Sequence, residues 1–490
     1  MTPTPSFYDR FNTWLRGSVM LKLVSIGILL LLLLIPSSMV ESLITERADN
    51  RDAATADISS QWGGPQLVLG PVLVLPYTAR ETDDKGLIRE LTRYACFLPD
   101  TLSSTGDLVP ERRHRGIYEA VVYRSRLRVQ GTFGSIDLNE VGVQPGAVRW
   151  AEAFVALGIS DMKGIRNGLT LRWDGQSRAF EPGVPNADVL PLGTAPTVST
   201  QVNAVQVARA RYSKYGPDGE EEQSGEVANG LSASVPLADY GALTRSHRFE
   251  FNLDLNGSTG LLLAPLGRQT RVHLTAPWPD PSFIGAFLPT QRTITSQNFQ
   301  ADWQVLHLNR SYSQHWRTDG DRPNVDESTF GVRLLVPVNE YLKTMRSAKY
   351  ALLPLTLTFL VFFFVEVLNR RRIHPFQYIL VGLALVIFYV LLLALSEQMA
   401  FDAAYALAAL VIIGLVTAYA GATFRNRQLT LATSGVLTLV YGFVFVVLQL
   451  QDYALLVGSL GLVTVLAAVM FLSRNIDWYG PDEAPSRPTA

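Results

Sequence analysis

The chain has 490 residues and a formal net charge of −1, and 48% of its residues are hydrophobic whereas only 17% are charged. So low a charged fraction in a long chain is typical of a protein that lies partly in lipid. The near-neutral balance argues against nucleic-acid binding, which needs a basic face to displace counterions. Cys96 is the single cysteine, so no intrachain disulfide can form, and we expect it to be buried in a strand.

The first apolar run covers residues 19–40 and is long enough to cross the roughly 30 Å hydrocarbon layer as a helix. Arg10 and Arg16 precede it, which predicts that residues 1–18 stay in the cytoplasm. A cleaved signal peptide is the alternative, but the Ala-x-Ala site at 54–56 lies far beyond the end of the apolar run. We therefore expect an uncleaved transmembrane helix.

Residues 43–346 contain no other segment that could span a membrane, and they are polar and rich in Gly and Pro. Apolar and polar residues alternate at 118–133 and 249–255, with shorter alternations at 272–274 and 303–305. Such alternation predicts strands with one buried and one wet face, which is typical of antiparallel sheet. The region therefore predicts a β-dominated domain of sandwich or sheet-stack type.

Turn signals separate the alternating runs: Gly-Pro at 70–71, Pro-Asp-Gly at 217–219 and Asn-Gly at 256–257. Only residues 48–60 and 150–157 look helical within this region. The stretch 176–200 is dense in Pro and Gly, and it is either a boundary between two lobes or a long loop.

Five further apolar runs follow, and each is long enough to be a transmembrane helix. They cover residues 350–368, 376–395, 403–424, 429–450 and 453–472. Their short connections predict antiparallel neighbours, which gives six transmembrane helices with the large β-rich domain inserted between helices 1 and 2.

Basic and basic-free connections alternate along this helical region. Arg370, Arg371 and Arg372 follow the second helix, Arg425 and Arg427 follow the fourth, and Arg474 follows the sixth. The other two connections hold Glu397 with Asp402, and Asp452, without Lys or Arg. Because basic loops stay in the cytoplasm, the pattern predicts that both termini, including residues 473–490, are cytoplasmic and that residues 43–346 are periplasmic.

Long strings in the chain are similar to those of one protein family. They are ERADNR (46–51), GGPQLVLGPVLVLP (63–76), WPDPSFIGAFLPTQR (278–292), FQADWQ (299–304), KYALL (349–353), HPFQYILVGLALVIFYVLLLALSE (374–397) and RNIDWY (474–479). The chain resembles the CreD family of inner-membrane proteins, also called cell envelope integrity proteins, nearly from end to end. The resemblance implies an envelope-stress role tied to a sensor-kinase regulatory system and to the β-lactam response, without an established chemical activity. Gln398 stands where the family pattern has a histidine, which argues against proton handling there.

Two residues have the spacing of a serine acylase of penicillin-binding type. Ser160 and Lys163 would lie one helical turn apart in such an enzyme. A Lys-Thr-Gly strand is also required, but the Lys343-Thr344 pair is followed by Met345. We therefore predict no catalytic residues and no enzyme activity.

Metal binding also lacks a motif. No two of the extracytoplasmic histidines, His114, His247, His273, His307 and His315, have metal-ligand spacing on one element. His247 and His273 could still meet across strands. Asp319, Asp321, Asn324 and Asp326 could wrap calcium loosely, but Pro323 replaces an oxygen ligand, so a plain turn is favoured. We predict neither metal nor cofactor.

Glu366 is an acid within the second predicted span. An acid at the centre of a span costs a few kcal/mol, and less near the interface. One interpretation is that its side chain snorkels towards Arg370 or the lipid headgroups. The other is a functional intramembrane acid that is protonated or paired with a neighbouring helix.

The segment 278–292 combines three prolines with apolar side chains, so we expect neither a regular strand nor a helix there. Trp278, Phe283 and Phe287 are too apolar for an idle surface loop. They either plug the open end of the β-rich domain or act as binding anchors for a partner.

The sequence thus predicts a non-enzymatic inner-membrane protein of envelope integrity that acts through a periplasmic binding domain. A transporter or lipid-handling protein that uses the helix bundle is the alternative. The expected partners are the lipid bilayer and a periplasmic or cell-wall component, and no nucleic acid. Neither the oligomeric state nor the identity of that component follows from the sequence.

Overall fold

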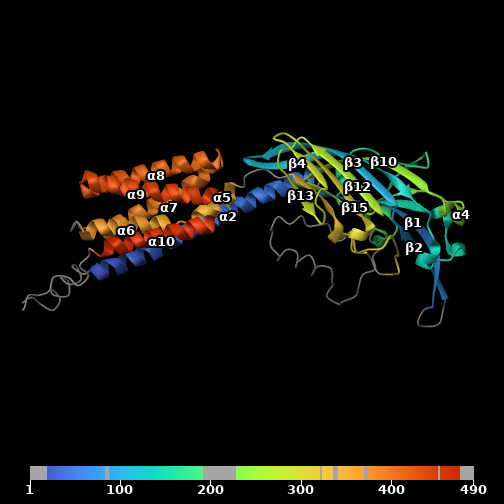
Figure 1. The fold of residues 1–490 in the computed structure, drawn as a ribbon, viewed down its shortest axis with the longest axis horizontal. Coiled ribbons are helices and arrows are strands. Elements are labelled where there is room, and N and C mark those ends of the chain that lie inside the picture. The colour runs from blue at the N-terminus through green and yellow to red at the C-terminus, as the bar shows by residue number, and fades with distance from the viewer. Residues whose placement is uncertain are drawn as a thin grey trace, which may run out of the picture. The chain divides into compact units, whose positions relative to one another are not determined.

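The computed structural model describes residues 19–82, 88–190, 228–320, 323–334, 340–368, 373–450 and 453–474. The chain divides into two compact units. One comprises Met1–Asp52 with Val338–Ala490 and contains membrane helices, and the other, Ala53–Pro337, contains two sheets (Figure 1).

A single long helix, α2 (Val19–Trp62), begins the described chain. Its first half is the apolar run, and its second half is polar but contains neither Gly nor Pro. Residues 48–60, which we expected to be helical, lie in the second half of this helix. The end of the first span at residue 40 stays a prediction. Because residues 41–62 contain no helix breaker, the helix continues for 44 residues, or about 66 Å.

Helix α2 ends where two glycines follow Trp62. The Gly63 amide donates to the Ser59 carbonyl at 2.8 Å. Gly63 has a φ of +141°, and a Cβ there would lie 2.8 Å from the Asn256 carbonyl oxygen. Only glycine fits this turn without strain, so the sequence itself fixes where the helix stops.

The unit Ala53–Pro337 contains a nine-stranded sheet. Its strands are β1 (Gln66–Thr82), β2 (Ile88–Phe97), β5 (Phe154–Ile159), β8 (Glu181–Val184), β9 (Ala228–Ser234), β11 (Gly260–Leu263), β13 (Pro281–Gly285), β16 (His315–Arg317) and β17 (Phe330–Leu334). The main order is β13-β17-β11-β1-β5-β9-β8, and β2 joins β1 to β16. Strand β5 is buried at every position, as expected for a strand covered on both faces.

The second sheet has eight strands. They are β3 (Thr101–Arg115), β4 (Tyr118–Phe133), β6 (Thr170–Trp173), β7 (Gln176–Ala179), β10 (His247–Ser258), β12 (Gln269–Ala276), β14 (Gln291–Ile294) and β15 (Phe299–Leu306). Their order is β14-β15-β12-β3-β4-β10-β6-β7. The predicted alternations at 118–133, 249–255, 272–274 and 303–305 lie in β4, β10, β12 and β15. Buried and exposed residues alternate along them, so this sheet has one wet face.

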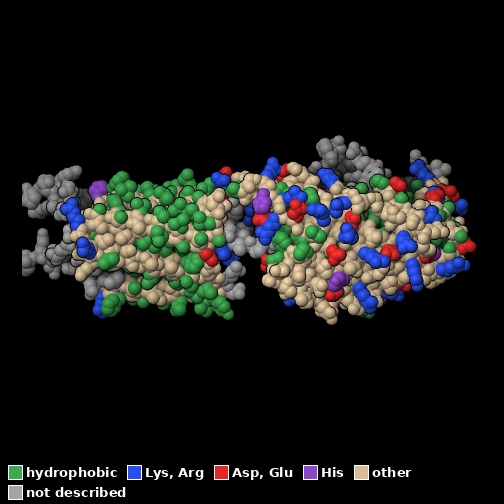
Figure 2. All heavy atoms as spheres, turned by 90° about the horizontal axis from the view of Figure 1, so that it is seen from above, with side chains coloured by type: hydrophobic (Ala, Val, Ile, Leu, Met, Phe, Trp, Pro, Cys, Tyr) green, Lys and Arg blue, Asp and Glu red, His purple; other side chains and the backbone are tan. Residues whose placement is uncertain are grey.

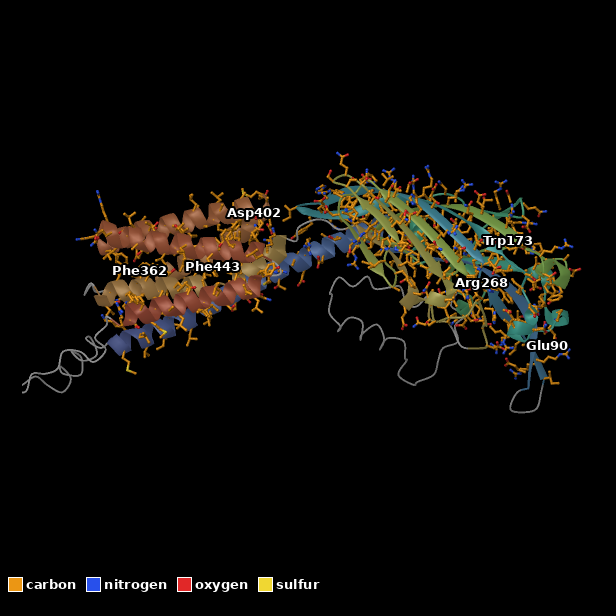
Figure 3. The ribbon with its side chains drawn as sticks, viewed as in Figure 1. Glu90, Trp173, Arg268, Phe362, Asp402 and Phe443 are labelled. Atoms are coloured by element: carbon orange, nitrogen blue, oxygen red, sulfur yellow. The ribbon has the colours of Figure 1, made fainter. Side chains whose placement is uncertain are left out.

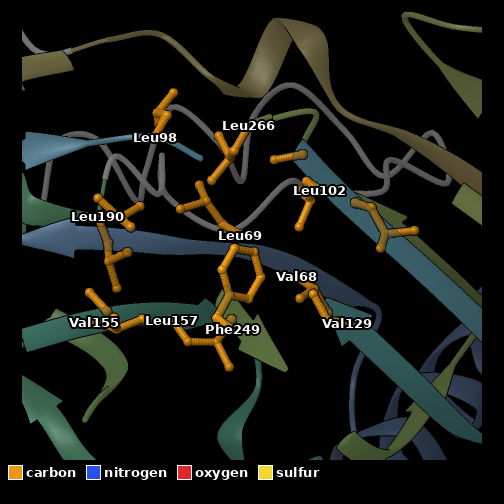
Figure 4. Packing of buried hydrophobic residues seen from close by; sticks show 14 of the residues in the cluster. Val68, Leu69, Leu98, Leu102, Val129, Val155, Leu157, Leu190, Phe249 and Leu266 are labelled. Carbon is orange, nitrogen blue, oxygen red and sulfur yellow. The ribbon is translucent and has the colours of Figure 1, made fainter. Parts of the chain in front are cut away.

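The two sheets share one hydrophobic core. Val68 and Leu69 on β1 of the nine-stranded sheet lie close to Val129 and Phe249 of the eight-stranded sheet (Figure 4). Antiparallel pairs dominate, and β1 with β11 and β12 with β3 are parallel pairs. The core holds Ala53–Pro337 together as one compact unit, so a division into two lobes is not observed in its described residues.

The other unit is helical after residue 338. Its helices are α5 (Glu340–Lys349), α6 (Leu352–Leu368), α7 (Pro375–Ser396), α8 (Phe401–Phe424), α9 (Arg427–Gln449) and α10 (Ala454–Ser473). Within the described residues, five helices are long and apolar enough to cross a membrane, or six if α5 and α6, bent by 40°, count as one span. Hydrophobic side chains cover this unit, whereas charged side chains gather on the sheet unit (Figure 2). The predicted fold class, membrane helices with a large antiparallel-rich domain inserted after the first, is confirmed.

Several local predictions were wrong. Gly70-Pro71 and Asn256-Gly257 lie inside β1 and β10 instead of forming turns, because long neighbouring strands pair across them. Residues 150–157 form a 3₁₀ turn at Trp150–Glu152 and then enter β5. The sheet-containing unit is Ala53–Pro337, and residues at both ends of the predicted periplasmic domain, 43–346, belong to α2 and α5. The predicted turn at 217–219 lies outside the described residues.

Candidate functional site

An ion pair lies inside the helical unit. Glu366 on α6 is 6% exposed, and its Oε1 is 2.9 Å from Lys22 Nζ on α2, which is 32% exposed. The Tyr378 hydroxyl of α7 donates to Glu366 Oε2 at 3.0 Å. Three helices therefore meet at one carboxylate, whose two oxygens are both engaged.

Aromatic rings surround this carboxylate. The Tyr378 ring lies edge-on to Phe359 at 5.4 Å and to Phe362 at 5.9 Å. Phe362 also packs on Phe424 of α8 at 5.1 Å, and its place within the bundle is labelled in Figure 3. Aromatic surroundings of this kind reduce the access of water. This strengthens the attraction between the Glu366 and Lys22 charges but makes their desolvation costly.

The partners of Glu366 distinguish between its two interpretations, snorkelling towards Arg370 and pairing with a neighbouring helix. Arg370, the expected snorkelling partner, lies outside the described residues. The observed partners are a lysine from the first helix and a tyrosine from the third membrane helix. This geometry favours the interpretation in which Glu366 pairs with neighbouring helices. The pairing of Lys22 with Glu366 could not be predicted from the sequence, because Lys22 lies near the start of the apolar run, where a basic flanking residue is ordinary.

Trp278 of the predicted binding segment is buried, with 6% of its surface exposed. The Arg112 guanidinium lies over its ring at 5.3 Å. A tryptophan that is buried in its own domain offers little surface to a partner.

Phe283 and Phe287 are half-buried against the same core. The Phe283 ring lies edge-on to Phe299 at 5.9 Å and to Trp303 at 5.7 Å. Phe287 lies edge-on to Phe330 at 5.9 Å. The segment also forms regular strand at β13 and β14, contrary to our expectation, because β13 occupies a sheet edge where proline is tolerated. This packing favours the interpretation in which the segment closes the domain.

The hydroxyl of Ser160 is engaged by the backbone. It donates to the Pro65 carbonyl at 2.9 Å and accepts from the Leu67 amide at 2.8 Å. Met162–Gly164 is a 3₁₀ turn instead of the α-helix that a serine acylase needs, and Lys163 is exposed. Neither residue is placed for acylation.

Complete burial raises the pKa of the Cys96 thiol, so the thiolate is disfavoured.

Three histidines of the sheet unit each face one carboxylate. Nδ1 of His247 is 2.6 Å from Asp174, Nδ1 of His273 is 2.7 Å from Asp302, and Nδ1 of His315 is 3.2 Å from Glu140. His247 and His273 do not meet, since β4 and β3 separate their strands. No group of three metal-ligating side chains occurs within the described ranges.

The acidic loop that was compared with a calcium site is only partly described, because Asp321 lies outside the described residues. Asp319 pairs with Arg317 at 3.0 Å and accepts from the Tyr77 hydroxyl at 3.3 Å. Burial, with the nearby Asp319 charge, raises the pKa of Tyr77 to about 12. Asp319 thus acts within the domain as a hydrogen-bond acceptor.

The geometry defines a class: a multi-pass membrane protein with one large sheet domain inserted after its first helix. A family model described as Inner membrane protein CreD matches residues 18–479. The chain therefore belongs to the CreD family of inner-membrane proteins, as the resemblance implied. It is similar to inner membrane protein CreD of Escherichia coli (strain K12), with 32% identity over 469 residues that cover 95% of each chain. No solved structure matches the chain significantly.

Replacing Glu366 with Gln tests the intramembrane pair. The change leaves Lys22 without its carboxylate, and we expect the free energy of unfolding of the full chain in mixed micelles to fall by about 1–3 kcal/mol, a value reduced because Lys22 is partly exposed. Adding Lys22→Met should recover part of that loss. Asp402→Asn, at an exposed acid of α8, is the matched control and should change little. Strictly additive effects of the two substitutions would show that the pair is not coupled.

Phe283→Asp separates the two interpretations of the aromatic segment. If Phe283 closes the domain, a buried charge beside Phe299 and Trp303 should lower the melting temperature of the full chain clearly. Leu288→Asp is the control, because Leu288 is 69% exposed and the same charge there should leave the melting temperature unchanged. A stable Phe283→Asp protein that has lost its envelope phenotype would instead establish Phe283 as a binding anchor.

Proposed function

We propose that this protein holds its sheet domain on the periplasmic side of the inner membrane and acts there by binding an envelope component, without catalysing a reaction. The observation that carries the proposal is the large wet face of the eight-stranded sheet, on which hydrogen-bonding and charged side chains point outwards from strand after strand. A domain that is inserted between membrane helices and presents such a face suits recognition of a polar partner.

The proposed orientation rests on the distribution of charge. Arginines lie in two connections and directly after the last span, and the two connections that alternate with them contain Asp or Glu but no Lys or Arg. The positive-inside rule then assigns both termini to the cytoplasm and the sheet domain to the periplasm.

The proposed role of the helices is anchoring. One hollow among the described helices has a volume of about 190 Å³ and is lined mainly by apolar side chains of α9 and α10, among them Phe443 (Figure 3). Transport paths usually contain several polar or broken segments near the middle of the membrane. The described helices favour anchoring over transport on this ground.

The biological setting follows from the family. Membership of the CreD family of inner-membrane proteins supports a place in the cell envelope. A part in envelope integrity and in the stress response to β-lactams is what the family resemblance implies. The partner in that role would be a periplasmic or cell-wall component that meets the sheet domain.

Labelling of single cysteines tests the topology. Cys96 is completely buried, so the folded parent should not react with a membrane-impermeant maleimide. We expect Leu308→Cys, at a position 79% exposed in the sheet unit, to be labelled in intact spheroplasts. Gln428→Cys, at an exposed position in the first turn of α9, should be labelled only after lysis. Labelling of both positions on the same side of the membrane would overturn the proposal.

Incubation with a fluorescent penicillin tests the absence of acylase activity. Because the Ser160 hydroxyl is already bound by two backbone groups, we expect no covalent labelling of the full chain. Ser160→Ala should keep the envelope phenotype, although losing these bonds should cost about 1–2 kcal/mol of stability. Labelling that disappears in Ser160→Ala would establish an enzyme.

A further inference from the structure

The outward face of the eight-stranded sheet contains two adjoining hollows. The first has a volume of about 350 Å³ and lies over β3, β12 and β15. The second has a volume of about 510 Å³ and lies over β3, β4, β6 and β10. Ser103 lines both, so the two hollows adjoin at β3, and we refer to them together as the polar depression.

The arginines of this sheet divide into two groups. The eight strands contain eleven arginines, and seven of them form an ion pair with a carboxylate. The other four have no ionic partner among the described residues: Arg178, Arg248, Arg271 and Arg292. Arg178 and Arg292 lie on the edge strands β7 and β14, whereas Arg271 lines the first hollow and Arg248 the second. The arginines without an ionic partner that lie away from the sheet edges are therefore the ones that line the hollows.

The strand register sets the spacing of these two guanidinium groups. Arg271 pairs with Ser103, Ser103 with Gln130, and Gln130 with Glu250, which is two residues from Arg248. The backbones of Arg271 and Arg248 are therefore three strand-to-strand spacings apart and are shifted by two residues along the strand. Together these separate them by about 15 Å. Two anionic groups would have to lie a comparable distance apart on one ligand.

The remaining lining side chains are mostly hydroxyls and amides. Thr101, Thr132 and Gln130 lie in the second hollow, and Thr105 and Gln304 lie in the first. Each hollow also contains one carboxylate with a basic partner: Asp302 is bound to Nδ1 of His273, and Glu250 is paired with Arg128. The aromatic residues that border the hollows, Trp303 and Phe249, are each 2% exposed, so no ring is offered for stacking or as an apolar anchor.

We propose that this depression binds an acidic oligosaccharide, with one anionic group on Arg271, another on Arg248, and ring hydroxyls on the polar side chains between them. Guanidinium groups bind carboxylates and phosphates through paired, charge-assisted hydrogen bonds. Hydroxyls and amides suit a ligand that is rich in hydroxyl groups. A protein partner would need exposed aromatic anchors, which the described lining does not supply.

This inference rests on the proposed function, since it names the ligand class of the proposed binding domain. Its test uses purified full-length protein in lipid nanodiscs, so its failure is distinguishable from a failure of the topology labelling. The probes are hexagalacturonate, which carries a carboxylate on every ring, the neutral maltohexaose, and inorganic phosphate. We expect calorimetry to detect binding of hexagalacturonate and not of maltohexaose.

Substitutions at the arginines locate the site. Arg271→Gln and Arg248→Gln should each weaken binding of hexagalacturonate about ten- to a hundredfold, because each removes a charge-assisted hydrogen-bonding group. Arg271→Lys should lose less, because the charge remains. Arg124→Gln is the matched control: it removes the same charge from the same sheet, but from an arginine already paired with Glu111 at 3.3 Å, and it should change affinity less than about threefold.

Three outcomes would overturn the inference. No binding of hexagalacturonate would exclude the ligand class. Equal weakening by all three Arg→Gln variants would indicate unspecific attraction to a charged surface. Competition by phosphate at the same affinity as hexagalacturonate would indicate a site for a single anion. Unchanged melting temperatures of the variants should accompany each measurement, because the substituted side chains are exposed.

Discussion

The attachment of the end of α2 to both sheets is the constraint on which the sheet domain depends. The indole N–H of Trp62 donates to the Tyr123 carbonyl of the eight-stranded sheet at 3.2 Å. Four residues later, the buried Gln66 amide donates to the Asp161 carbonyl, directly after β5, at 3.1 Å and to the Asn256 carbonyl of β10 at 3.0 Å. Because one short segment is bonded to both sheets, the helix end cannot rotate without disturbing the core that they share.

The outline of this fold could be predicted from the sequence because its strongest signals are periodic and local. A wet sheet face requires alternation, and β4 and β10 alternate over most of their lengths because their outer positions meet water. Spans require long apolar runs, which the chain contains wherever a membrane helix is described. The apolar run 19–40 and the helical stretch 48–60 were identified from the sequence but were not connected into α2, although residues 41–47 contain no Gly, Pro or cap that would end a helix.

The polar contacts of the candidate site could not be predicted in the same way. Lys22 and Glu366 lie at opposite ends of the sequence, and their contact depends on how the helices pack. Asn256-Gly257 is a strong turn signal in isolation, yet both residues pair with β4 in register, at Arg124 and Tyr123. Long-range pairing outweighed a local preference that is worth only a fraction of the energy of a well-packed sheet.

Charge is arranged differently in the two units, and this difference supports the proposal that the sheet face is the recognition surface. Glu366, the one acidic side chain that is buried among the described helices, has both carboxylate oxygens engaged by Lys22 and Tyr378. A group that is satisfied in this way links helices, and a passing solute would have to break those contacts at a cost of several kcal/mol. On the sheet, Arg248 and Arg271 keep unneutralised charge in a polar depression that is open to water. Binding there requires no internal contact to be broken, so the sheet face meets the energetic requirement of a recognition surface better than the helix bundle does.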